Sequence, residues 1–319
     1  MNREIIYNLI VILGPTASGK TALAARLASE LGSEIISADS RQVFRGMDIG
    51  TGKDLSEFCI DDKHIPYHLI DIIDPTDEFS VYDFQRLFYG LFEDCISREI
   101  APVLVGGTGL YIDSVLRGYS MQKVPVNKGL RADLDGVALN TVADRLKTLR
   151  PGLHNTTDLF EKERAIRALE IALFERDNPT PKGNRPEIVP LVFGTRWDRP
   201  LLRDRISKRL KDRLDAGMVE EVARLHEEGI SWEKLNYFGL EYRYIGLFLQ
   251  GKLNRNDMFQ KLNSAIHQFA KRQETWFRRM ERHGIDINWI DDADYDRLKK
   301  IVNSKLTRSI KNIKNAPLP

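Results

Sequence analysis

The sequence predicts an α/β fold: a doubly wound parallel sheet with helices on both faces, interrupted by a small all-helical insertion. Short β-branched apolar runs alternate with segments of helical apolar spacing, and the first run stops at a glycine-rich loop. A long stretch without strand-like runs then breaks this alternation. The chain has 319 residues, 42% of them hydrophobic, which is enough for one large domain or two smaller ones.

The alternation of strands and helices is clearest before residue 118. Residues 5–13 form an apolar run that stops at Gly14, which is typical of a strand buried on both faces of a parallel sheet. Residues 21–31 show helical spacing of their apolar side chains and end at Gly32. By the same criteria we expect strands over 34–38, 68–73 and 102–105 and a helix over 81–99.

The pattern changes after residue 118. We expect residues 119–187 to form the helical insertion, with helices over 130–149 and 159–175 and a Pro-, Gly- and Asn-rich connector over 177–186. A strand over 188–193 returns to the sheet, so that 1–118 and 188–319 form one core domain. Long helices are predicted over 199–225 and 265–280, and the Lys-rich tail after Asp296 is expected to fray.

Composition excludes several classes of protein. With 42% hydrophobic and 29% charged residues, the chain is neither disordered nor fibrous. No apolar run approaches the ~18 residues of a membrane helix, and the N-terminal run leads into the glycine loop instead of a signal-peptide cleavage site. Cys59 and Cys95 are too few for a disulfide scaffold or a cysteine zinc site, and the histidines show no metal-ligand spacing. We therefore expect a cytoplasmic protein with no membrane partner.

The charge is distributed unevenly. The net charge is only +2, but residues 196–282 contain 19 Lys and Arg against 13 Asp and Glu. This basic stretch is compatible with a polyanionic partner such as nucleic acid, and equally with an ordinary solvated helix face.

A phosphate-binding loop follows the first predicted strand. It matches G-x-x-x-x-G-K-[ST] and comprises Gly14, Pro15, Thr16, Ala17, Ser18, Gly19, Lys20 and Thr21. The glycines permit backbone turns that aim N–H groups at phosphate oxygens, and the following helix adds the positive end of its dipole. Lys20 is expected to neutralise the terminal phosphate, and the Thr21 hydroxyl to bind Mg²⁺. The motif predicts a P-loop NTPase-like sheet and a diphosphate or nucleotide ligand such as ATP, without choosing between them.

Two polar residues are predicted to face this loop. Asp39 follows the second strand and Thr108 the fourth, and ligands of open α/β sheets bind beyond the carboxyl ends of the strands. Asp39 is a candidate general base, Mg²⁺ ligand or helix N-cap. Thr108 is a candidate hydrogen-bond partner of that base or of a substrate phosphate.

These motifs are part of a longer pattern, and on it the chain resembles the tRNA dimethylallyltransferase family, also called tRNA isopentenyltransferases or IPP transferases. The similarity extends over roughly residues 5–285. Its matching segments are 14–21, 39–51, 66–71, 74–75, 105–111, Arg164 with 167–170, Arg205 with Arg209, 270–273 and 275–278.

The resemblance implies an activity: transfer of a dimethylallyl group from dimethylallyl diphosphate to N6 of adenosine 37, beside the anticodon of tRNA. In this reading the phosphate loop, Mg²⁺ at Thr21 and Arg209 hold the departing diphosphate. Asp39 accepts the N6 proton and selects adenine, while Thr108 fixes the reacting groups. The adenine must leave the base stack to enter the crevice, which costs a few kcal/mol.

The resemblance also implies contacts with the tRNA anticodon loop. The implied residues are Asp39, Ser40, Arg41, Gln42, Thr108, Arg131, Glu163, Arg164, Ala165, Ile166, Arg167, Lys271, Arg272 and Arg279. In the helix over 265–280, Arg272 and Arg279 share a basic face opposite an apolar one, so this face contacts phosphate or is simply solvated. We expect the protein to act as a monomer.

Two stretches depart from the family pattern. The Asp-Pro and Asn-Asp elements usual before Arg164 are replaced by residues 151–154 and by Phe160 and Glu161. The Ile-Gly-Tyr-Lys element is replaced by Phe238, Gly239, Leu240 and Glu241. Both elements are associated with tRNA contact in the family.

Two other functions share parts of this pattern. A P-loop kinase of a small metabolite or nucleotide would use the same loop, crevice and carboxylate, but it does not account for residues 39–51 or for the basic helices. An RNA-binding protein without catalysis would have no need to keep Lys20, Thr21, Asp39 and Thr108 together. Phosphate transfer from ATP in the absence of tRNA would favour the kinase.

Overall fold

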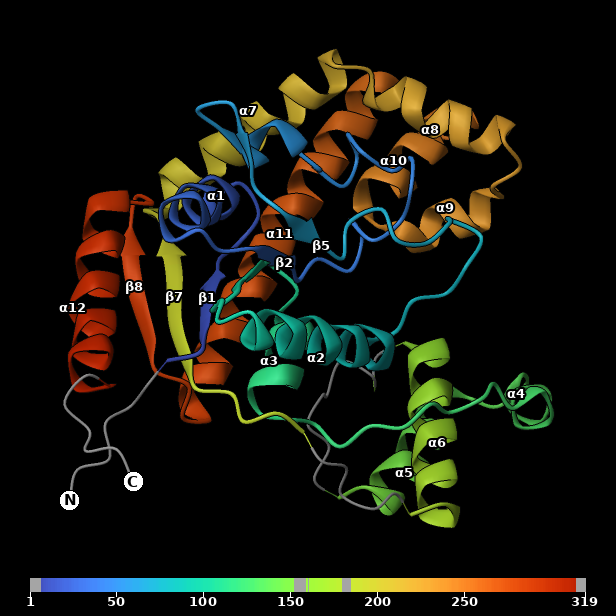
Figure 1. The fold of residues 1–319 in the computed structure, drawn as a ribbon. Helices are drawn as coiled ribbons and strands as arrows, with labels where there is room; N and C mark the ends of the chain where they lie inside the picture. The colour runs from blue at the N-terminus through green and yellow to red at the C-terminus, as the bar shows by residue number, and fades with distance from the viewer. Residues whose placement is uncertain (1–6, 152–158, 160, 180–184, 314–319) are drawn as a thin grey trace. The chain divides into compact units, whose positions relative to one another are not determined.

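The computed structural model describes residues 7–151, 159, 161–179 and 185–313. The chain divides into two compact units: Met1–Gly118 with Pro186–Pro319, and Tyr119–Arg185 (Figure 1). The second unit ends two residues before the expected insertion boundary of 187.

A parallel sheet forms the centre of the first unit. Over the described residues its strands are β1 (Leu9–Leu13), β2 (Ile35–Ser37), β5 (Tyr67–His68), β6 (Val103–Gly106), β7 (Pro190–Arg196) and β8 (Ile287–Asp291). They lie in the order β5-β2-β6-β1-β7-β8, and every neighbouring pair is parallel. The predicted α/β class with a doubly wound sheet is therefore confirmed.

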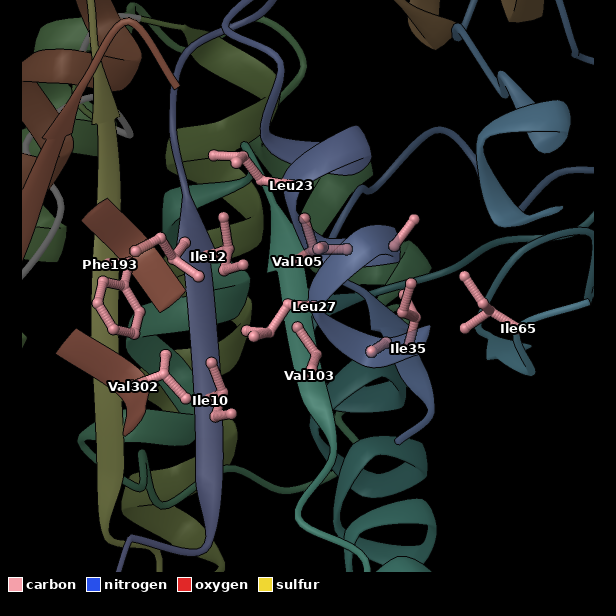
Figure 2. Close-up of a cluster of buried hydrophobic side chains, with 14 of the residues drawn as sticks. Ile10, Ile12, Leu23, Leu27, Ile35, Ile65, Val103, Val105, Phe193 and Val302 are labelled. Carbon is pink, nitrogen blue, oxygen red and sulfur yellow. The ribbon is translucent and has the colours of Figure 1, made fainter. Parts of the chain in front are cut away.

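Helices cover both faces of this sheet. On one face, Ile10 and Ile12 of β1 pack against Leu23 and Leu27 of α1 (Lys20–Leu31), with Val302 of α12 (Tyr295–Ile313) in the same cluster (Figure 2). The alternate residues of β1 point to the other face. There they meet α2 (Val81–Ser97), α3 (Gly109–Leu116) and α11 (Arg255–Arg282). All of β1 is buried, which explains why its sequence is continuously apolar.

A second group of helices in this unit surrounds its own apolar core. It consists of α7 (Arg199–Asp215), α8 (Met218–Glu227), α9 (Trp232–Phe238) and α10 (Leu240–Leu249), joined by part of α11. The expected single helix over 199–225 is wrong. The chain breaks at Gly217, whose φ of 98° is left-handed and cannot continue a right-handed helix. The short elements η1 (Leu55–Phe58), β3 (Cys59–Ile60) and β4 (Lys63–His64) complete the unit.

The second unit is helical over its described residues, as expected. Its helices are α4 (Lys128–Leu134), α5 (Leu139–Leu149) and α6 (Lys162–Asp177). The predicted helix over 130–149 is two helices separated by a turn at Asp135 and Gly136. Leu134, Val142, Leu146 and Leu169 form the buried core of this unit.

Three further expectations are corrected by the structure. The strand over 68–73 stops at His68, because Leu69 and Asp71 have left-handed φ values of 62° and 54°. The tail after Asp296 does not fray at once: α12 extends to Ile313, and Leu298 and Val302 are fully buried against the sheet. The edge strand β8 was not expected at all. Within the described residues, no helix is long and apolar enough to cross a membrane.

Candidate active site at the carboxyl edge of the sheet

The phosphate loop connects β1 to α1. Gly19 has a left-handed φ of 81° and immediately precedes the helix. Among the described residues no side chain caps the first turn of α1, and that turn contains no acidic residue. The first N–H groups and the positive end of the helix dipole therefore remain available for an anion.

Three neighbouring residues hold the loop in shape. Thr195 on β7 donates a hydrogen bond to the Ser18 hydroxyl (2.6 Å), and a Cβ on Gly14 would overlap the Thr195 hydroxyl. The Trp197 indole donates to the Ser18 carbonyl (2.9 Å). The Arg205 guanidinium stacks over Trp197 and donates to the Ala17 carbonyl (2.9 Å). The loop is thus preorganised before any ligand binds.

Lys20 lies near both arginines and carboxylates. Its Nζ donates to the Pro15 carbonyl (3.3 Å). Burial lowers the pKa of Lys20 to about 8, with a further contribution from Arg209, while Asp39 opposes the shift. Arg209 on α7 reaches this region from the other end of the chain and pairs with Asp54 at 2.7 Å. A ligand that carries negative charge would relieve the repulsion between these cations.

Asp39 directs the turn that follows β2. Its Oδ1 accepts hydrogen bonds from the backbone N–H groups of Arg41 (2.8 Å) and Gln42 (3.4 Å). No helix starts here, so the N-cap alternative is wrong and the carboxylate instead organises an Asx-type turn. Among the described residues Oδ2 accepts no hydrogen bond, which leaves it available to a substrate.

Thr108, which follows β6, is hydrogen-bonded to the segment that follows β2. Its N–H donates to the Ala38 carbonyl (3.2 Å), and its hydroxyl accepts from the Ser40 N–H (3.1 Å). Because β2, β6 and β1 are neighbours in the sheet, Asp39, Thr108 and the phosphate loop share one carboxyl edge. The sequence-based expectation that these elements face one crevice agrees with this topology.

Two functional candidates escaped the sequence reasoning. The buried amide of Gln273 on α11 accepts from the Thr16 N–H and donates to the Gly107 carbonyl, both at 2.9 Å. The buried Glu221 carboxylate accepts from the N–H groups of three successive residues, 48–50, and from the Tyr242 hydroxyl. In the sequence, the only indication of these roles was that Gln273 and Glu221 lie on helix faces that are otherwise apolar.

The expected RNA-binding residues of the first unit lie in two places. Arg41 on the turn after Asp39 stacks over Tyr237, with 5.2 Å to the ring centre. Gln42 is held inward by Ser37 (3.1 Å) and the Gly52 carbonyl (3.1 Å).

The remaining expected residues of this unit are Lys271, Arg272 and Arg279 on α11. Lys271 and Arg272 are exposed, and Arg279 is half-buried. Phe269, 39% exposed, lies beneath Arg272, and Trp276 beneath Arg279. Aromatic rings beside arginines are the chemistry that stacks on unpaired bases.

The expected residues of the second unit divide into exposed and structural groups. Glu163 and Arg164 are exposed on α6. Arg131 and Arg167 both bind the buried Glu170 carboxylate, at 2.8 and 2.9 Å. Ala165 and Ile166 are buried in the core of the unit, so their side chains pack there and do not present a binding surface. Of the departures from the family pattern, residues 152–154 and Phe160 lie outside the described residues.

A divalent cation would find few protein ligands here. No group of three or more His, Cys, Asp or Glu able to hold a metal occurs among the described residues. Thr21 lies in the first turn of α1. Its hydroxyl has no hydrogen-bond partner among the described residues. Mg²⁺ commonly takes its ligands from water and substrate phosphates with one or two protein oxygens, so this sparse donor set fits it.

Comparisons with known proteins place these features in one family. The IPP transferase model matches residues 42–280, and an isopentenyl transferase model matches 7–61. A tRNA dimethylallyltransferase 2 from Pelobacter propionicus is 58% identical over 89% of this chain and 90% of its own. A tRNA dimethylallyltransferase 1 from Syntrophus aciditrophicus is 56% identical over 95% of this chain and 99% of its own. The crystal structure of the full-length tRNA isopentenylpyrophosphate transferase from Bacillus halodurans superposes with a TM-score of 0.68 at 31% identity, covering 96% of this chain and 99% of that one. The chain therefore belongs to the IPP transferase family.

Proposed function

We propose that this enzyme transfers a dimethylallyl group from dimethylallyl diphosphate to N6 of adenosine 37 in tRNA, releasing diphosphate. The observation that carries the proposal is the shared edge of the sheet, where the cationic phosphate loop faces the Asp39 carboxylate. Relatives 56–58% identical over most of the chain are named tRNA dimethylallyltransferases, which favours this reaction over the kinase alternative.

The phosphate loop would hold the leaving group. In the reaction the bond between C1 of the dimethylallyl group and its diphosphate oxygen breaks, and the electron pair stays on that oxygen. In this proposal the loop N–H groups, Lys20 and Arg209 stabilise that negative charge. Charge stabilisation of this kind at a preorganised site is worth several kcal/mol.

Mg²⁺ would be held by the Thr21 hydroxyl together with diphosphate oxygens. When bound, it neutralises part of the charge that develops on the leaving diphosphate.

Asp39 would act on the nucleophile. The exocyclic N6 forms a new bond to C1 and must lose one proton, which Oδ2 of Asp39 is free to accept. Oδ1 is already engaged by the turn, so the carboxylate is fixed in orientation. Thr108 positions Asp39 through the Ser40 N–H.

The substrate RNA would reach this edge with its adenine turned out of the stack. The arginines and aromatic rings of α11, with the turn at Ser40 and Arg41, form the binding surface in the first unit. Glu163 and Arg164 are the exposed candidates in the second. We propose that the enzyme acts as a monomer in the cytoplasm, where tRNA is modified.

A product assay tests this function. Purified protein is incubated with dimethylallyl diphosphate, Mg²⁺ and bulk tRNA, and the RNA is digested and analysed by mass spectrometry. The proposal predicts N6-dimethylallyl adenosine and stoichiometric diphosphate. Phosphate transfer from ATP without tRNA, and no modified nucleoside, would instead support a kinase.

A further inference from the structure

Arg213 is a half-buried cation that the mechanism above does not use. It lies one helical turn after Arg209 on α7 and lines a small cavity with the phosphate-loop residues Thr16 and Ala17. Its Nη2 atom is buried and has no hydrogen-bond partner among the described residues. Among the described residues, no carboxylate oxygen lies within 4.0 Å of a nitrogen of the Arg213 guanidinium.

This arrangement is unfavourable without a ligand. A buried charge is normally paired, because its desolvation is otherwise uncompensated. Burial and, after it, the neighbouring Arg209 lower the pKa of Arg213 to about 10. Glu241 and Asp54 act against this shift, but neither forms an ion pair with Arg213 among the described residues.

Two features keep Arg213 in this position. A Cβ on Gly52, which has a left-handed φ of 69°, would overlap the Arg213 guanidinium, so glycine makes the room for it. Glu241 at the start of α10 lines the same cavity and attracts Arg213 without forming an ion pair with it. Burial raises the pKa of Glu241, and Arg213 opposes that shift. Glu241 is also one of the residues at which the chain departs from the family pattern.

We propose that Arg213 is a third cation of the diphosphate site, whose guanidinium donates to a diphosphate oxygen beside those held by Lys20 and Arg209. Glu241 is a positioning residue that balances part of its charge. This inference rests on the proposed function, since the diphosphate is the leaving group of that reaction. The cavity is lined by the phosphate-loop residues Thr16 and Ala17 and by Arg209, which favours the anion that this loop binds over an RNA backbone.

Binding of inorganic diphosphate tests this role without requiring catalysis. Its dissociation constant is measured by titration calorimetry in the presence of Mg²⁺ for wild type, Arg213→Met and Arg213→Lys. Met keeps the unbranched apolar stem and removes the charge. Arg203→Met is the matched control, because Arg203 is an exposed arginine of the same helix.

We expect Arg213→Met to weaken diphosphate binding at least about tenfold, the effect of one charge-assisted hydrogen bond. Arg213→Lys should retain part of the affinity, and Arg203→Met should stay within about twofold of wild type. Affinity for tRNA should not change, and KM for dimethylallyl diphosphate should rise in parallel with the dissociation constant.

Unchanged diphosphate affinity in Arg213→Met, together with a lower thermal midpoint, would overturn the proposal and make Arg213 a structural residue. If Arg213→Met does not fold, wild-type affinity in Arg213→Lys at pH 7 together with a normal KM would do so. Failure of the proposed function gives a different result: diphosphate binding would still depend on Arg213 while no modified adenosine forms.

Discussion

The Gln273 side chain of α11 accepts a hydrogen bond from the Thr16 N–H of the phosphate loop at 2.9 Å. The same amide donates to the carbonyl of Gly107, the residue before Thr108. One buried side chain therefore fixes the loop for the leaving group and the strand end that positions Asp39. Because α11 also carries Arg272 and Arg279, RNA bound to its exposed face would lie on the helix that holds the catalytic loops.

Gln273→Glu should impair catalysis more than folding. A carboxylate can accept from the Thr16 N–H but cannot donate to the Gly107 carbonyl, so two acceptors would face each other in a buried site. We expect a loss of about 1–3 kcal/mol in the free energy of unfolding. We also expect kcat to fall at least tenfold with little change in tRNA affinity.

Gln268→Glu provides the control, because Gln268 is exposed on the same helix. The single-turnover rate and the thermal midpoint are measured for both variants. Equal rates in the two variants would mean that the Gln273 bridge has no role in positioning.

Lys20→Ala should weaken diphosphate binding and slow transfer, while tRNA affinity changes little. The pKa of about 8 adds a pH signature, since the unliganded site holds Lys20 charged below that value and neutral above it. The advantage of wild type over Lys20→Ala in diphosphate affinity should be full below pH 8 and should shrink as the pH rises. Calorimetric titrations from pH 7 to pH 9.5 measure it, and a pH-independent advantage would contradict a role for the Lys20 charge.

Salt dependence tests the basic face of α11. If Arg272 and Arg279 contact phosphates, log affinity for tRNA should fall linearly with log salt concentration. Arg279→Ala should reduce that slope by about one contact or less. Arg297→Ala on α12 is a suitable control, because Arg297 is an exposed arginine that pairs with Asp291. A slope unaffected by Arg279→Ala would leave this face simply solvated.

Glu170 should determine the acid stability of the second unit. Its burial acts to raise its pKa, but hydrogen bonds from Arg131 and Arg167 outweigh burial and hold the pKa below the usual value. A carboxylate with a depressed folded-state pKa stabilises the fold above its unfolded pKa and loses this effect as the pH falls through the folded one. We expect Glu170→Gln to unfold at lower temperature than wild type at pH 7, with the difference shrinking below about pH 4. A constant difference down to pH 3 would argue against it.

The sequence allowed strands β1, β2, β6 and β7, the phosphate loop and the places of Asp39 and Thr108 to be predicted, because each follows from local patterns and from the rule that parallel strands end at a common edge. The break at Gly217 was missed since the apolar spacing of residues 199–225 continues across it. The sequence could not show that Arg213 and Glu241 line the same cavity, because they come from different helices that only the tertiary fold brings together. The same holds for Gln273, which bridges two loops more than 160 residues away in the chain.

Substitutions of Asp39 can show whether it acts as a general base or only shapes the turn. Asn preserves Oδ1, and so keeps the hydrogen bonds to Arg41 and Gln42, but it has no basicity. Ala removes both functions. The turn alone is worth about 1 kcal/mol by analogy with side-chain caps, so a purely structural role predicts an unstable Ala variant and a fully active Asn variant.

The most direct test is therefore the single-turnover rate of adenosine alkylation in Asp39→Asn, measured with saturating dimethylallyl diphosphate, Mg²⁺ and tRNA. A general base contributes roughly 10²–10⁴-fold, so we expect Asn to be nearly as slow as Ala, with a thermal midpoint close to wild type and unchanged diphosphate affinity. An Asn variant that alkylates adenosine at the wild-type rate would contradict the account and leave Asp39 as a structural residue of the turn.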